Sequence, residues 1–174
     1  MVRSRLAHLA AVALVGLALA SCSRSPGGEE VLHRYPVDDL DGVLTRDGVA
    51  IDRAVTSDGN GSLRIQEAEP KIVHLYDLEN VDVEDARLTY RAKLRTDKVD
   101  GPVFLEMWCR FPGLGEFFSR ALQSPLSGTT EWTSQETHFF LREGQNPDLI
   151  KLNLVIGGSG TVWIDDIVVC ESPL

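Results

Sequence analysis

The stretch that decides the fold of this chain is residues 157–169, Gly-Gly-Ser-Gly-Thr-Val-Trp-Ile-Asp-Asp-Ile-Val-Val. A glycine-rich turn leads into a run of β-branched and aromatic residues, which predicts a buried strand. Two adjacent carboxylates, Asp165 and Asp166, interrupt the run. A carboxylate in a buried strand needs a partner, because burying an unpaired charge is costly. A calcium ion, loop amides or basic residues of a neighbouring strand could each supply that partner.

The chain before this stretch has the same character. Proline and glycine recur at short intervals, and the runs between them are rich in Val, Ile, Leu, Thr and aromatic residues. This pattern predicts an all-β sandwich or barrel. Apolar residues alternate with Arg, Lys and Thr over 86–95, which indicates one buried face and one solvated face. We expect the basic residues of that solvated face to pair with acidic neighbours across the strands.

Two further segments matter for a possible site. Alternation over 103–111 places Glu106, Trp108 and Arg110 on an outward face. Residues 115–123 fit a helical period through their apolar residues, whereas the flanking glycines favour a strand that pairs back on the preceding one. We predict the strand.

The glycine turn, Trp163 and the Ile164-Asp165 pair resemble the closing strand of jelly-roll carbohydrate-binding modules, which are galactose-binding-like β-sandwiches. Residues 58–65 look like that family's turn into an early strand, and 127–132 resembles its Gly-Thr-x-x-Trp turn before a strand. The resemblance implies an all-β, jelly-roll β-sandwich of two antiparallel sheets over residues 31–174. It also implies a structural calcium ion, since the Asp after the Ile often ligates calcium in that family. The expected metal ligands are Asp165, Asp58 and Asp39.

The usual winding of a jelly roll would gather residues 71–78, 149–156, 103–111 and 115–123 into one sheet. Its outward face would interleave polar and aromatic side chains: His74, Tyr76, Glu106, Trp108, Arg110, Lys151 and Asn153, with Phe118 and Arg120 beside them. Sugar rings stack on aromatic side chains, and their hydroxyls hydrogen-bond to amide, carboxylate and basic groups. The sequence therefore predicts carbohydrate recognition on this face. The alternative is a structural or protein-interaction role without a sugar site, in which loops cover the same face.

Catalysis is a weaker interpretation. The sequence contains no Gly-x-Ser-x-Gly or His-Glu-x-x-His motif. A glycosidase needs two facing carboxylates, and Glu106 is the only carboxylate placed centrally on the outward face. We therefore predict a non-catalytic protein and rank a small glycan hydrolase or lyase third.

The N-terminus resembles an export signal. Arg3 and Arg5 precede an apolar run over 6–20, which is the length of a signal-peptide core and short for a membrane span. The run ends in Leu-Ala-Ser-Cys, which is similar to a bacterial lipobox with Cys22 as the lipidated residue. We predict a signal peptide over 1–21, a flexible tether over 22–30, and an exported, lipid-anchored protein of the cell envelope. Ser23, in place of an Asp, resembles outer-membrane sorting in a Gram-negative cell.

Charge and cysteine content limit the partners further. The formal net charge of the 174-residue chain is −9, which argues against nucleic acid as a partner. The two remaining cysteines, Cys109 and Cys170, could form a disulfide bond in an exported protein. Their expected placement on opposite sheets disfavours the bond, because stacked sheets lie about 10 Å apart.

Overall fold

The computed structural model describes residues 28–174, which contain nine β-strands and no α-helix in that range. Their bounds in chain order are β1 (Glu30–Tyr35), β2 (Val49–Asp52), β3 (Ser62–Glu67), β4 (Lys71–Glu79), β5 (Ala86–Phe111), β6 (Gly115–Arg120), β7 (Leu126–Leu141), β8 (Leu149–Ile156) and β9 (Gly160–Pro173). The predicted signal peptide, Cys22 and residues 22–27 of the tether lie outside the described residues. Over 28–174, no helix is long and apolar enough to cross a membrane.

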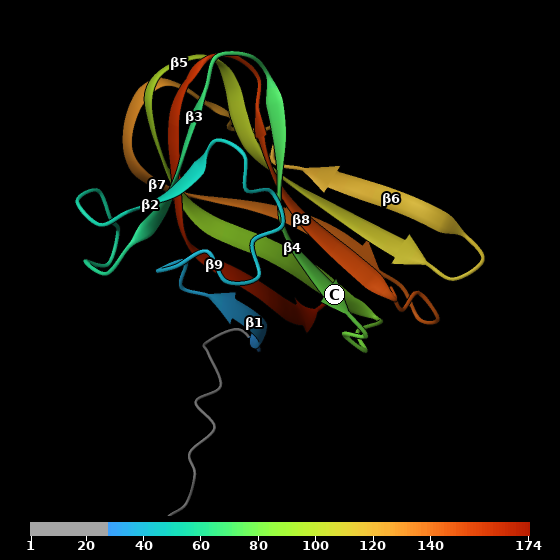
Figure 1. The fold of residues 1–174 in the computed structure, drawn as a ribbon. Coiled ribbons are helices and arrows are strands. Elements are labelled where there is room, and N and C mark those ends of the chain that lie inside the picture. Colours follow the sequence, from blue (N-terminus) through green and yellow to red (C-terminus); the bar gives the residue numbers. More distant parts are fainter. Residues whose placement is uncertain (1–27) are drawn as a thin grey trace, which may run out of the picture.

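The strands form two facing layers joined into one curled sheet (Figure 1). In the first layer, β1 and β3 pair with successive parts of one edge of β9, β2 extends the layer beyond β3, and the first half of β5 and then β7 follow on the other edge. The second layer has the order β4, β8, second half of β5, β6. This is the sheet that the sequence predicted, and residues 115–120 are a strand as expected. All pairings are antiparallel, so the predicted fold class is confirmed.

Strand β5 belongs to both layers because it bends near residues 98–102. Lys98 and Gly101 have positive φ angles of 52° and 140°. A Cβ atom on Gly101 would lie 2.6 Å from the carbonyl carbon of Gly157, so only glycine fits this approach. The Asp100 N–H donates to the carbonyl oxygen of Ser159 at 2.8 Å. The glycine-rich turn over 157–160 is therefore the place where the bend of β5 contacts the start of β9.

The core confirms the period-two predictions. The apolar residues of 86–95 are buried, as are Val103, Leu105, Met107, Cys109 and Phe111. On the opposite face the expected acidic partners are found for Arg91, which contacts Glu29 at 2.9 Å and Glu136 at 3.0 Å, and for Arg95, which contacts Glu131 at 3.5 Å, whereas Arg87 donates to Ser172 Oγ. Both Cys109 and Cys170 are buried free thiols, one in each layer.

Two boundaries differ from the predictions. Residues 127–132 were expected to form a turn, but they are the first part of β7. Their register against β5 shifts repeatedly between Leu94 and Val103, because this part of β7 follows the bend of its partner. At the N-terminal end, β1 begins at Glu30 and Glu29 bonds Arg91, so the last two residues assigned to the tether lie against the domain.

Candidate functional site

The outer face of the second layer holds a shallow groove of about 270 Å³. Alternation brings side chains from four strands to it, since residues of one parity share a face. Its lining residues are Ile72 and His74 on β4, Trp108 on β5, Glu116 on β6, and Lys151 and Asn153 on β8. The register of β5 with its two neighbours brings these side chains together, because Trp108 lies opposite Lys151 of β8 and opposite Phe118 of β6.

Glu106 forms the floor beside this groove and is almost completely buried, with 1% of its surface exposed. Its Oε1 accepts hydrogen bonds from Trp108 Nε1 at 2.7 Å and Asn153 Nδ2 at 3.0 Å. Its Oε2 accepts from Arg120 Nε at 2.6 Å. Burial alone would raise the pKa of Glu106, but the three hydrogen bonds outweigh it and hold the pKa below its usual value. Glu106 is therefore a charged anchor that orients Trp108 and Asn153.

Asn153 has an acceptor with no partner. Its side-chain oxygen Oδ1 is buried and accepts no hydrogen bond from residues 28–174. The Asn153 side chain cannot rotate freely, since its amide nitrogen is held by Glu106. A buried amide oxygen without a donor is unfavourable, so this atom is suited to a ligand hydroxyl.

Around Asn153 the groove carries polar side chains that already have partners within the chain. Lys151 contacts Glu116 at 2.8 Å, and His74 contacts Asp77 at 2.7 Å. Aromatic surface lies next to them, with the ring centroids of Trp108 and Phe118 4.9 Å apart. The groove therefore offers half-exposed ring surface beside neutralised polar groups.

The predicted placement of Tyr76 on this face is wrong. A bulge at Leu75 shifts the register of β4, so His74 lies opposite Asn153 while Tyr76 lies opposite the buried Leu152. Tyr76 therefore points between the layers, where it is 4% exposed and stacks on Tyr35 with centroids 3.7 Å apart. Tyr76 and Trp108 share a sheet but occupy its opposite faces.

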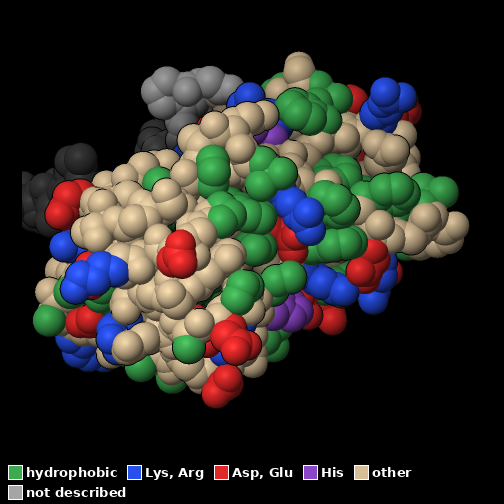
Figure 2. All heavy atoms as spheres, turned by 90° about the horizontal axis from the view of Figure 1, so that it is seen from above, with side chains coloured by type: hydrophobic (Ala, Val, Ile, Leu, Met, Phe, Trp, Pro, Cys, Tyr) green, Lys and Arg blue, Asp and Glu red, His purple; other side chains and the backbone are tan. Residues whose placement is uncertain are grey.

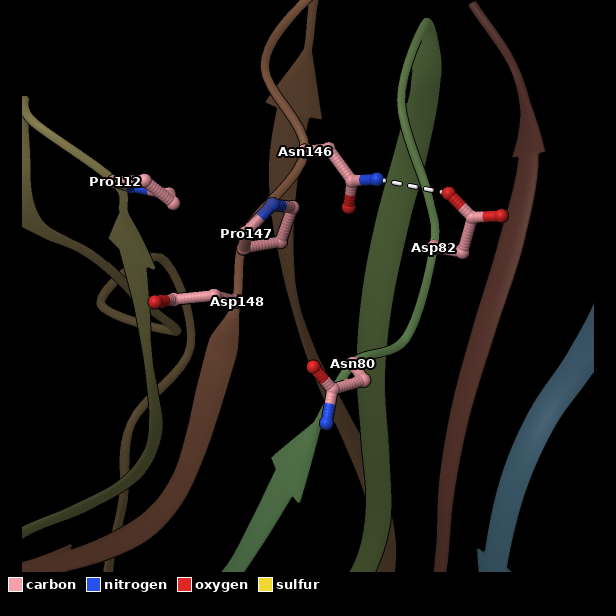
Figure 3. Close-up of a pocket in the computed structure, with 6 residues that line it drawn as sticks. All are labelled: Asn80, Asp82, Pro112, Asn146, Pro147 and Asp148. Atoms are coloured by element: carbon pink, nitrogen blue, oxygen red, sulfur yellow. Dashed lines mark hydrogen bonds between the residues drawn. The ribbon is translucent and has the colours of Figure 1, made fainter.

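Arg110 lies on the predicted face but toward its far end, outside the groove. It forms a two-bond ion pair with Asp148, at 2.8 and 3.2 Å. A second hollow of about 400 Å³ lies next to Asp148, lined also by Asn80, Asp82, Pro112, Asn146 and Pro147 (Figure 3). Asn146 Nδ2 donates to Asp82 Oδ1 across it at 2.9 Å, and Asn146 Oδ1 accepts from Val83 N–H. These side chains hold neighbouring loops together, and none of the predicted ligands lines the hollow.

The three expected calcium ligands do not fit one site. Asp165 is fully buried, and its oxygens accept the N–H groups of Ser57 and Asp166, each at 2.8 Å. Asp58 bonds the backbone and side chain of Asn60, and Asp39 bonds the N–H of Asp41. Within 28–174 no three His, Cys, Asp or Glu side chains are grouped to hold a metal ion. Backbone amides of the loop at Ser57 and of the next residue in β9 are the partners that Asp165 uses, and burial raises its pKa.

Sequence reasoning missed Glu116 and Ile72 in the groove. Both could have been found by parity alone, since Glu116 shares a face with Phe118 and Ile72 shares one with His74.

With this geometry the fold can be compared with known proteins. No protein-family model matches the chain, and no curated protein matches it in sequence. Solved structures do match. The CBM22-1 xylan-binding domain from Paenibacillus barcinonensis Xyn10C is 12% identical, with a TM-score of 0.61 over 86% of this chain and 99% of that chain. The Family 16 Carbohydrate Binding Module-2 is 11% identical, with a TM-score of 0.56 over 77% of this chain and 95% of that chain.

A third match adds a ligand-bound example. The CBM22-1–GH10 modules of the Clostridium thermocellum xylanase 10B, complexed with xylohexaose, are 9% identical with a TM-score of 0.57, covering 80% of this chain and 28% of that chain. The class of the fold is therefore the jelly-roll β-sandwich of carbohydrate-binding modules. Within that class, this chain is similar in fold to modules of families 22 and 16.

Proposed function

We propose that the groove on the outer face of β4, β8, β5 and β6 binds a glycan. The observation that carries the proposal is the lining of the groove, in which the partly exposed ring of Trp108 lies beside the polar side chains of His74, Lys151 and Asn153. A sugar matches this lining, because its apolar ring face can stack on the indole while its hydroxyls bond the polar side chains. Lys151 and His74 lie at the groove walls and can donate to further hydroxyls.

The first ligands to test are neutral glycans. The cationic side chains at the groove, Lys151 and Arg120, each already have a carboxylate partner within the chain, so an acidic sugar would gain little from them. Xylan is the leading candidate, since structures with this fold include xylan-binding domains. A glycan array on the purified protein, followed by isothermal titration calorimetry, would define the ligand.

Trp108→Ala is the decisive variant. Loss of one stacking ring should weaken glycan affinity roughly tenfold, with a similar loss for Asn153→Ala. Phe140→Ala is the matched control, because Phe140 is an exposed aromatic residue that does not line the groove. Full retention of Trp108→Ala on a glycan gel that retains the unmodified protein would remove the proposal.

We infer further that the protein is non-catalytic. A general acid in glycoside hydrolysis needs a raised pKa, whereas hydrogen bonds hold the pKa of Glu106 low. The other carboxylate of the groove, Glu116, is bound to Lys151. Incubation with the polysaccharide that binds should release no new reducing ends. A steady rise in reducing ends that Glu106→Gln abolishes would contradict the inference.

The proposal also places the protein on a membrane through a lipid at Cys22, exported to the cell envelope. It rests on the lipobox-like sequence, and Cys22 lies outside the described residues. Two or more acyl chains would hold the domain stably on the bilayer. Cys22→Ser should abolish incorporation of labelled palmitate and release the protein from the membrane fraction. Unchanged labelling in that variant would refute the anchor.

A further inference from the structure

Strand β6 has an open edge. Among the described strands it pairs with β5 alone (Figure 1). The N–H of Ala121 donates to the carbonyl oxygen of Leu105 at 3.0 Å, so the odd-numbered residues of β6 direct their backbone groups toward β5. By alternation, Glu116 and Phe118 direct their N–H and C=O groups to the free edge, as Arg120 does its N–H, while the Arg120 C=O accepts the Leu122 N–H at 2.9 Å.

This edge lacks the usual protection against strand pairing. Exposed edges are commonly blunted by Lys, Pro or a bulge. The sequence of β6 is Gly-Glu-Phe-Phe-Ser-Arg, and its register with β5 runs without a shift from Arg120 to Gly115. The edge is therefore free of Lys, Pro and bulges, and the two charged residues among its six, Glu116 and Arg120, require opposite charges on any strand that pairs with it.

Exposed apolar side chains gather around the same edge. Four of the large hydrophobic residues that are exposed in 28–174 lie on β6 or its flanking turns: Leu114, Phe117, Phe118 and Leu122. Figure 2 shows hydrophobic side chains collected on this side of the molecule, with charged side chains among them. A concentration of apolar surface of this kind marks an interaction site.

We propose that the partner is a second copy of this chain, paired β6 to β6 in antiparallel fashion about a twofold axis. Side chains directly opposite in such a pair must point to the same face, so residues of equal parity meet. Placing Phe118 opposite Phe118 brings each Glu116 opposite the Arg120 of the other copy. A shift by two residues in either direction would set a charged side chain opposite Phe118 instead. Charge complementarity therefore selects one register.

The charged atoms needed for this pairing are available. Glu116 holds Lys151 through Oε1, which leaves Oε2 without a hydrogen-bond partner among residues 28–174. Arg120 holds Glu106 through Nε, which leaves its two terminal nitrogens for the second copy. Each opposite-charge pair occurs twice by symmetry.

The twofold axis of the proposed dimer is perpendicular to the sheet, so the two grooves with Trp108 would face the same side. A polymer could then contact both grooves at once.

Cross-linking in intact cells tests the register with the full-length chain. Directly opposed strand residues have Cα atoms about 5.5 Å apart, within the disulfide range of about 4.4–6.8 Å. Phe118→Cys should therefore yield a disulfide-linked dimer on non-reducing gels after mild oxidation. The unsubstituted chain and Phe140→Cys are the controls, since Phe140 is 63% exposed but lies off the edge strand.

A second pair of variants tests the edge itself in the Phe118→Cys background. Glu116→Pro removes an N–H that faces the free edge and should abolish the cross-linked band, while the bonds to β5 remain. Glu116→Ala removes only the charge, which should raise the dimer dissociation constant roughly two- to thirtyfold. Equal cross-linking of Phe118→Cys and Phe140→Cys, or a band that survives Glu116→Pro, would overturn the dimer. An unchanged thermal midpoint confirms that each variant is folded.

Discussion

Replacing Glu106 with Gln is a direct test of the anchor beneath the groove. Glu106 accepts three hydrogen bonds, and each comes from an N–H donor: Trp108 Nε1, Asn153 Nδ2 and Arg120 Nε. Gln presents one oxygen and one NH₂ group, so an N–H must face an N–H whichever way the amide is turned. The least costly orientation gives up the Arg120 bond, because Arg120 is partly exposed and can turn to solvent.

The expected loss is that of one hydrogen bond to a charged group, about 1.5–3 kcal/mol. For a domain of this size, the melting temperature should fall by roughly 3–12 °C. Circular dichroism at pH 7 measures the shift. Glu116→Gln is the matched control on the same face, since its surface ion pair with Lys151 is worth at most about 1 kcal/mol.

The pH dependence gives a second readout. The folded-state pKa of Glu106 lies below its usual value of 4.5, so its stabilising effect is present above pH 4.5 and is lost as pH falls through the folded-state pKa. The difference in stability between the unmodified protein and Glu106→Gln should therefore shrink in acid. Equal melting temperatures at pH 7, or a difference that acid leaves unchanged, would refute the role of Glu106 as a charged anchor.

Three further outcomes are expected. Tyr76→Ala should cost about 3–5 kcal/mol in the free energy of unfolding, yet leave glycan affinity intact in the folded fraction, because its ring packs between the layers; selective loss of affinity would contradict that placement. Gly101→Ala should lower the melting temperature strongly, since its Cβ would contact Gly157, and a neutral effect would show that the bend can relax. Burial raises the pKa of Cys109 and of Cys170 to about 12, so a thiol reagent at pH 8 should modify them only in denaturant; fast labelling of the native protein would contradict their burial.

The alternation of side chains was sufficient to predict which residues face the core, and the resemblance to jelly-roll modules supplied the grouping of the strands into one sheet. Apolar residues over 86–95 and 103–111 must share a face at period two, and the observed core follows that pattern. The same parity placed Trp108 and Asn153 on the outer face, where both line the groove. Local pattern was enough for these residues because β5 and β8 pair without a register shift over this part of the sheet.

Tertiary structure alone decided the rest, because it depends on which backbones meet. The bulge at Leu75 arises in the pairing of β4 with β8, and it turns Tyr76 inward although its sequence parity matches His74. Asp165 accepts the N–H of Ser57 because the loop around Ser57 folds over it, and these two residues are 108 positions apart in the sequence. The continuous β5 and the open edge of β6 likewise follow from contacts between distant segments, and no local pattern of residues encodes those contacts.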